Sequence, residues 1–273
     1  ETSVRCLLWD TWRRAMTSPV NSIKRGNSRF YVDPLNDNLK LPSVTSVMNA
    51  LAKPALKFWA AKKTAEAAVE EFGTVALMVG QGKTEGAIDY LKRAPQRSSG
   101  PASKLGSEVH DICDRIAKGE DIKRVHPDHQ GFLDRFTNWI KDFEVGFMES
   151  EITVWSETYG YAGTLDAICL IDGEVVILDW KTGASGVWPD VALQLNAYAN
   201  ADCILEPDGT RRDIPNIEAA AVLHLRPEAA LLHPVRLGED VFDVFKALLV
   251  SDEWQREISK TVLGKPVTPK ERE

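Results

Sequence analysis

Three charged residues, Asp166, Asp179 and Lys181, have types and a spacing that could bind a cation or support acid–base chemistry. The two aspartates lie on either side of an Asp-Gly dipeptide at 172–173, which is among the strongest sequence signals for a two-residue turn. The runs that flank this dipeptide are apolar and rich in β-branched residues, as strands are. The sequence therefore predicts a β-hairpin that carries all three charged residues toward its open end.

The turn sets the register of this hairpin. If the Asp-Gly dipeptide forms the loop, Ile171 pairs with Glu174, and Asp166 lies opposite Asp179. Opposed side chains on one face have Cβ atoms about 4.5–5.5 Å apart, where like charges are destabilising. Because side chains alternate along a strand, Lys181 projects from the same face as Asp179. Two carboxylates and an ammonium are therefore expected to converge at one end of the hairpin.

The residues alone leave three interpretations of this cluster open. Lys181 could simply neutralise two carboxylates at the end of a sheet. The carboxylates could instead share a proton for acid–base catalysis, which requires one strongly raised pKa. They could also bind Mg²⁺ or Mn²⁺, because these ions prefer hard oxygen ligands and are well served by one or two carboxylates together with water and a phosphate.

The segments around the hairpin alternate between helical and strand patterns. A basic, flexible linker is expected at 92–104, and a helix then begins at Gly106-Ser107 with Ser107 as its N-cap. The other expected elements are a helix at 128–146, a strand at 151–157, a helix at 189–202, strands at 219–225 and 230–237, and a helix at 239–259. This order predicts an α/β fold.

The first third of the chain differs in charge from the rest. Residues 1–104 carry 16 Lys and Arg against 9 Asp and Glu, whereas the remaining residues carry 17 against 31. Helices are expected at 3–16 and 55–72, and basic residues interleaved with aromatics on the longer one would suit a nucleic-acid backbone and its bases. The alternative is a solvated amphipathic helix with a buried Trp. The candidate substrate-binding residues are Lys53, Lys57, Trp59, Lys62, Lys63 and Arg97.

The composition narrows the class of protein. The net charge of the 273 residues is −7, and no run approaches the roughly 20 apolar residues that a membrane span needs. The start of the sequence lacks the basic and apolar regions of a signal peptide, so we expect a cytoplasmic protein without a membrane partner. The four cysteines are scattered without a Cys-x-x-Cys pair, which argues against a disulfide framework or a local zinc motif.

Four short motifs occur in an order that resembles the PD-(D/E)xK nuclease superfamily, in particular its RecB-like and Cas4-like branch and its phage-encoded exonucleases. They are Gly106-x-x-x-His110, Gly163-Thr164-x-Asp166, Asp179-Trp180-Lys181-Thr182-Gly183 and Gln194-Leu195-x-Ala197-Tyr198. The resemblance implies a restriction-endonuclease-like core at 105–237, with a central mixed sheet flanked by helices. Before it stands a basic, mainly helical N-terminal region (1–104) packed on the core, and after it a C-terminal helix and polar tail (238–273).

The resemblance also implies roles for these residues. His110, Asp166, Asp179 and the backbone carbonyl of Trp180 would bind Mg²⁺ or Mn²⁺, and Lys181 would orient and help deprotonate the attacking water. Gln194 and Tyr198 would position the substrate backbone or the surroundings of Lys181. Glu157, on the preceding strand, is a candidate for a second metal site. No Fe–S cluster is expected, because only Cys203 follows the Gln/Tyr helix, where related proteins place three cysteines.

The function expected from the resemblance is metal-dependent hydrolysis of DNA by an exonuclease acting on single strands or duplex ends. A structure-selective endonuclease acting on flaps or ends is the alternative within the same chemistry. A catalytically idle nucleic-acid-binding module is the alternative from another class. An RNA substrate also stays open, because such a site need not sense the 2′-hydroxyl.

Overall fold

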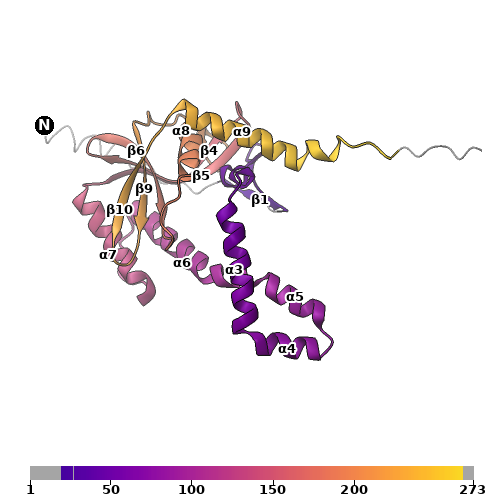
Figure 1. The fold of residues 1–273 in the computed structure, drawn as a ribbon. Coiled ribbons are helices and arrows are strands. Elements are labelled where there is room, and N and C mark those ends of the chain that lie inside the picture. The colour runs from indigo at the N-terminus through magenta and orange to yellow at the C-terminus, as the bar shows by residue number, and fades with distance from the viewer. Residues whose placement is uncertain (1–19, 27, 267–273) are drawn as a thin grey trace, which may run out of the picture.

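The computed structural model describes residues 20–26 and 28–266, so the helix expected at 3–16 lies outside the described residues. Its main feature is a seven-stranded mixed sheet with the strand order β10-β9-β6-β5-β4-β7-β8 (Figure 1). The strands are β4 (Gly146–Ser156), β5 (Tyr161–Ile171), β6 (Glu174–Lys181), β7 (Cys203–Leu205), β8 (Arg211–Arg212), β9 (Ala219–Leu225) and β10 (Ala230–Val235). The expected α/β class with a central mixed sheet flanked by helices is confirmed.

Helices cover both faces of this sheet. Helices α6 (Ala94–Ala117) and α7 (Pro127–Asp142) pack on one face, where the core includes Phe136 and Trp180. On the other face, α2 (Val44–Val47), α8 (Val191–Ala199) and α9 (Glu239–Arg256) pack around residues such as Ile177 and Phe245. Because consecutive residues of β6 alternate between these two cores, Asp179 and Lys181 leave the strand on the side of α8.

The hairpin of β5 and β6 has the register expected from its turn. Ile171 pairs with Glu174, and the antiparallel ladder continues to the pair Ala167–Leu178. Asp172 and Gly173 have φ values of 51° and 88°, and positive φ at both central residues is what a two-residue turn of this type requires. The ladder ends one step before Asp166 and Asp179, whereas β6 continues to pair in parallel with β9 as far as Lys181 and His224.

A second, three-stranded sheet precedes the helices. It consists of β1 (Ser22–Arg25), β2 (Ser28–Asp33) and β3 (Asn36–Pro42). Tyr31 and Leu41 of this sheet pack against Trp155 and Ala162 of the main sheet, which anchors the small sheet beside β4 and β5.

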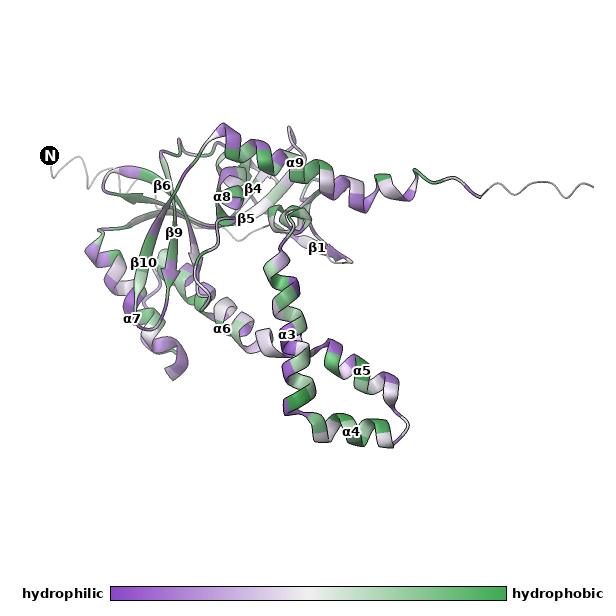
Figure 2. Cartoon of the chain, in the orientation of Figure 1, coloured by the Kyte–Doolittle hydropathy of each residue, from purple (hydrophilic) through white to green (hydrophobic). Residues whose placement is uncertain are grey.

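The next helices form an arm that projects away from the sheets (Figure 1). The arm contains α3 (Pro54–Glu70), α4 (Phe72–Gly80), α5 (Thr84–Lys92) and the first half of α6. A short 3₁₀ helix, η1 (Met48–Ala50), precedes the arm, and another, η2 (Ile258–Lys260), follows α9. Helix α4 is apolar around its whole circumference (Figure 2) and has no buried residue. No helix among the described residues is long and apolar enough to cross a membrane.

The expected linker at 92–104 is wrong. Most of this segment is the first half of α6, a helix of 24 residues that begins at Ala94 and not at Ser107. Pro95 lies in its first turn, where a missing N–H costs nothing, and Pro101 follows within the helix. Packing of α6 against α3 stabilises the helix despite the Gly and Pro residues that predicted a loop.

Candidate active site

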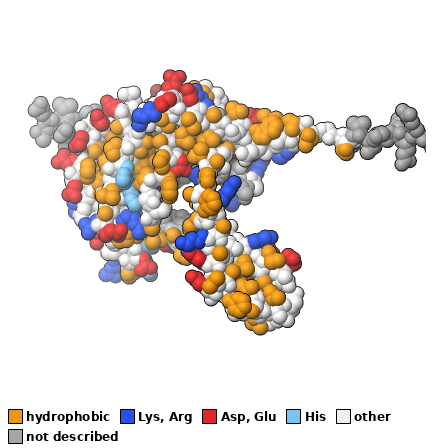
Figure 3. Space-filling model, in the orientation of Figure 1, with side chains coloured by type: hydrophobic (Ala, Val, Ile, Leu, Met, Phe, Trp, Pro, Cys, Tyr) orange, Lys and Arg blue, Asp and Glu red, His pale blue; other side chains and the backbone are white. Residues whose placement is uncertain are grey.

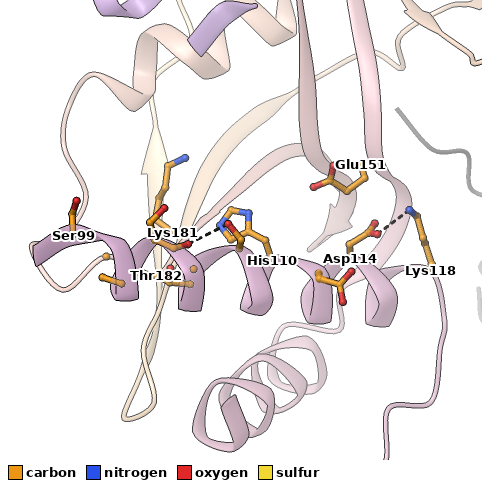
Figure 4. A pocket seen from close by; sticks show the side chains of 13 residues that line it. Ser99, His110, Asp114, Lys118, Glu151, Lys181 and Thr182 are labelled. Carbon is orange, nitrogen blue, oxygen red and sulfur yellow. Dashed lines mark hydrogen bonds and ion pairs between the residues drawn. The ribbon is translucent and has the colours of Figure 1, made fainter. Parts of the chain in front are cut away.

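A cleft of about 790 Å³ lies between α6 and the end of β6 (Figure 4). Helix α6 presents His110, Asp114 and Lys118 to it at helical spacing, and β6 contributes Lys181. The first half of α6 lines the same cleft with small side chains. At Gly106 an added Cβ would lie 3.0 Å from the hydroxyl of Thr182, so a glycine there lets α6 approach the end of β6 closely.

Asp179 is the buried centre of the site. Its Oδ1 accepts hydrogen bonds from Lys181 Nζ at 2.8 Å and from Gln194 Nε2 at 3.0 Å. Burial, together with the charge of Asp166, raises the pKa of Asp179 to about 6. Burial lowers the pKa of Lys181, but the charges of Asp179 and Asp166 outweigh it, so that this pKa is raised and Lys181 is a cation at neutral pH.

Asp166 and His110 reach the same point from β5 and α6. Asp166 Oδ2 accepts a hydrogen bond from the Trp180 N–H at 3.0 Å and lies 3.9 Å from His110 Nδ1. Burial raises the pKa of Asp166 to about 6 and lowers the pKa of His110 to about 4. His110 is therefore neutral at pH 7, the state in which an imidazole can bind a metal ion.

Gln194 and Tyr198 come from one face of α8 and are both buried. Gln194 Nε2 bonds to Asp179 and also to the Tyr198 hydroxyl at 3.2 Å, so this pair holds the aspartate in place from behind. Tyr198 packs directly on Gly163, where an added Cβ would lie 2.5 Å from its ring. This contact explains why a residue without a side chain is needed at position 163, three residues before Asp166.

The buried carboxylates fit a divalent cation. Asp179 Oδ2 is buried and has no hydrogen-bond partner among the described residues, although an uncompensated carboxylate oxygen is costly to bury. No three His, Cys, Asp or Glu side chains of the described residues converge as a complete metal-binding group. The donor set therefore suits an ion such as Mg²⁺, which keeps several water ligands and takes only one or two carboxylates from the protein.

Three acidic residues that line the cleft, Asp111, Asp114 and Glu151, were missed by sequence reasoning. Glu151 lies on β4 between Ser150 and Ile152, which pair with Ala167 and Leu165, so it stands across from Asp166. Burial, with the charges of Asp166 and Asp114, raises the pKa of Glu151 to about 7.

Asp114 accepts hydrogen bonds from Ser150 at 2.7 Å and from Lys118 at 2.9 Å. Its position four residues after His110 was the available signal for it. Glu157, considered for a second metal site, instead pairs with Arg211 at 2.7 Å and does not line the cleft.

The six candidate substrate-binding residues lie on α3 and α6 or directly before α3, and none of them lines the cleft. Lys53 pairs with Asp190 at 2.6 Å, and Arg97 stacks on Tyr90. Lys62 and Lys63 both pair with Glu66, Lys57 has no ion pair within the described chain, and Trp59 is partly exposed. The arm that carries them ends in an apolar surface around α4 (Figure 3), which is not a surface that attracts phosphates.

Comparisons with known proteins leave the family open. No protein-family model and no curated protein matches the chain. Among solved structures, one titled "Crystal structure of SSO0001" is similar at 15% sequence identity, over 62% of this chain and 67% of that one, with a TM-score of 0.35. A TM-score of this size does not establish a shared fold, and nothing about function follows from it.

Proposed function

We propose that this protein is a metal-dependent DNA nuclease of the PD-(D/E)xK type, acting as an exonuclease in the cytoplasm. The observation that carries the proposal is the buried Asp179, whose Oδ2 has no partner among the described residues while its Oδ1 bonds to Lys181, which lines the cleft.

Asp166 and Asp179 would hold a Mg²⁺ or Mn²⁺ ion, and His110 and the Trp180 carbonyl are the further ligands that the resemblance implies, although the three side chains do not already converge as a complete group in the described structure. When bound, such an ion lowers the pKa of a water ligand and neutralises charge on the scissile phosphate. Gln194 and Tyr198 keep the Asp179 carboxylate oriented, because both are buried and bonded to it or to each other.

Lys181 acts on the attacking water. Its side chain is 37% exposed and lines the cleft while its ammonium remains bonded to Asp179, so it can hold a water molecule at the edge of the carboxylate pair. The positive charge stabilises a developing hydroxide and the phosphorane oxygens, which is the role expected of a cation next to a phosphodiester under attack.

Digestion of labelled DNA tests the proposal. Wild-type protein should degrade linear DNA in Mg²⁺ or Mn²⁺ and lose this activity in EDTA, and Asp179→Asn should be inactive. Retained cleavage by the Asp179→Asn protein would sink the mechanism. No cleavage of single-stranded or duplex DNA by the wild type would favour the idle binding module.

Closed circular single-stranded DNA separates the two enzymatic modes. An exonuclease leaves the circle intact, whereas an endonuclease opens it. A matching RNA oligonucleotide determines whether the 2′-hydroxyl is tolerated.

A further inference from the structure

The small sheet of β1, β2 and β3 carries four cations that form no ion pair with any described residue. They are Lys24, Arg25, Arg29 and Lys40. Cations elsewhere near the site behave differently, since Lys53 and Lys181 each bond to a carboxylate at less than 3 Å. The small sheet therefore presents positive charge that the described chain does not compensate.

Two of these cations face each other directly. Lys24 of β1 is the cross-strand partner of Arg29 of β2, and both side chains are exposed. Like charges in such a pair are destabilising, so the arrangement is unfavourable unless an anion lies between them. Arg25 and Lys40 project from the opposite face, because Arg25 follows Lys24 on β1 and Lys40 pairs with Val32 on β2.

Arg29 of this pair is connected through Tyr31 to the strand that carries Asp166. Arg29 lies over the ring of Tyr31, with its guanidinium carbon 5.1 Å from the ring centroid. The Tyr31 hydroxyl in turn bonds to Thr164 at 2.7 Å, and Thr164 is two residues before Asp166 on β5. Arg29 thus stands at the end of a short chain of contacts that reaches β5 two residues from Asp166.

The backbone at Arg29 is fixed by the next segment of the chain. The Arg29 N–H donates to Ser46 Oγ at 2.8 Å, and the Arg29 carbonyl accepts from the Ser43 N–H at 2.8 Å. Ser43 is the N-cap of α2 and Ser46 lies within this helix, which packs in the core beside β5. A guanidinium held on such a support is suited to a ligand of fixed geometry.

We propose that Lys24 and Arg29 bind the phosphate backbone of the DNA strand whose scissile phosphodiester lies at Asp166 and Asp179. A phosphate between the two cations removes their repulsion, and the guanidinium binds phosphate oxygens through two parallel hydrogen bonds. This inference rests on the proposed nuclease function. It assigns backbone contact to the small sheet, whereas the sequence predicted it for the helical arm.

The test compares two double variants that remove equal charge. Lys24→Ala/Arg29→Ala removes the facing pair, and Arg25→Ala/Lys40→Ala removes two cations from the other face. Binding of fluorescein-labelled duplex and single-stranded DNA is measured by anisotropy in EDTA, over a series of NaCl concentrations. Loss of two phosphate contacts should reduce the slope of log K against log salt by about 1.8 for duplex and about 1.4 for single strands.

The matched double variant should change this slope by less than half as much. Equal changes in the two double variants would mean that only net charge matters, and an unchanged slope in Lys24→Ala/Arg29→Ala would overturn the proposal. The melting temperature is the second readout. A phosphate-binding role predicts that Lys24→Ala does not lower it, because the variant removes a repulsion. A clear decrease together with an unchanged salt slope would assign the pair a structural role.

Two further arms separate the sources of the anion and the two proposals. Inorganic phosphate is added to the wild type and to Lys24→Ala/Arg29→Ala, and the melting temperature is measured. If phosphate raises the melting temperature of the wild type only, while both proteins bind DNA equally, the site binds a free anion and the proposal for DNA fails. Cleavage by the wild type in Mn²⁺ is scored separately. DNA binding that depends on Lys24 and Arg29 without any cleavage would refute the nuclease and retain the backbone contact.

Discussion

Replacement of Asp179 by asparagine is expected to stabilise the metal-free protein while it abolishes cleavage. Burial and the charge of Asp166 raise the pKa of Asp179 from 3.8 to about 6. Because the folded pKa is above the unfolded one, the ionised carboxylate destabilises the fold increasingly as the pH rises from about 4 to about 6, and fully above that. A difference of about two pKa units corresponds to roughly 3 kcal/mol.

Part of that energy is recovered when the charge is removed. An asparagine oxygen can still accept the bonds from Lys181 and Gln194, and its amide nitrogen takes the position of the unpartnered Oδ2. Loss of the ion pair with Lys181 offsets some of the gain. We therefore expect a net increase of about 1–2 kcal/mol in the free energy of unfolding, or a Tm higher by roughly 2–6 °C.

Scanning calorimetry at neutral pH measures this change in EDTA and in MnCl₂. At about one hundred times its Kd, Mn²⁺ should add about 2.7 kcal/mol to the wild type and far less to Asp179→Asn. Asp252→Asn is the matched control, because Asp252 is a buried carboxylate on α9 that bonds to Arg256 and should keep the full response to Mn²⁺. A Tm of Asp179→Asn several degrees below that of the wild type in EDTA, or an undiminished response to Mn²⁺, would refute the reasoning.

Further predictions concern Lys181, Gly163 and Glu151. Lys181→Met should reduce turnover by orders of magnitude. Its Mn²⁺ affinity, measured by calorimetric titration, should be equal to or tighter than that of the wild type, because Lys181 competes with the ion for Asp179 Oδ1. Equal loss of affinity in Lys181→Met and Asp179→Asn would contradict separate roles for the two residues. Gly163→Ala places a Cβ 2.5 Å from the Tyr198 ring and should lower the free energy of unfolding, measured with denaturant, by about 1–3 kcal/mol. Gly100→Ala, in the open first half of α6, should raise it by up to about 1 kcal/mol. Equal effects of the two substitutions would show that the contact of Gly163 with Tyr198 does not matter for stability. Burial raises the pKa of Glu151 to about 7, so its ionisation should add about 2–3 kcal/mol to the stability that the metal-free wild type loses as the pH rises from about 4.5 to 7, beside the contribution of Asp179. Glu151→Gln should lose less stability than the wild type by this amount, and parallel stability curves would show that Glu151 is not responsible.

Local signals in the sequence were sufficient for the hairpin. The Asp-Gly turn determines the pairing of Ile171 with Glu174, and the alternation along β6 places Trp180 in one core and Lys181 at the cleft. Gln194 and Tyr198 were named from the resemblance of their motif, and their spacing of four residues is what puts them on one face of a helix. In each case the decisive interaction lies within a few residues or within one hairpin.

Long-range packing decides the parts that sequence reasoning missed. Glu151 enters the cleft because β4 pairs with β5 in a particular register, and no local pattern specifies that register. Residues 94–104 are helical because α3 packs against them, although Gly100 and Pro101 favour a loop in isolation. The ion pairs of Lys53 and Arg97 likewise depend on Asp190 and Glu71, which are distant in sequence, so interleaved basic residues on α3 were a poor guide to exposed charge.

The separation of β5 from β6 creates the candidate site. Their ladder stops at Ala167–Leu178, while β9 continues to hold β6 as far as Lys181, so β6 stays in place as β5 diverges from it. The N–H of Trp180 then lacks a backbone partner on β5, and the Asp166 carboxylate accepts its hydrogen bond instead. The same divergence leaves Asp179 Oδ2 buried without a donor. The single opening of the sheet thus accounts for both the hydrogen bond of Asp166 to the Trp180 N–H and the unpartnered Asp179 oxygen, which is the position that the proposed cation would fill.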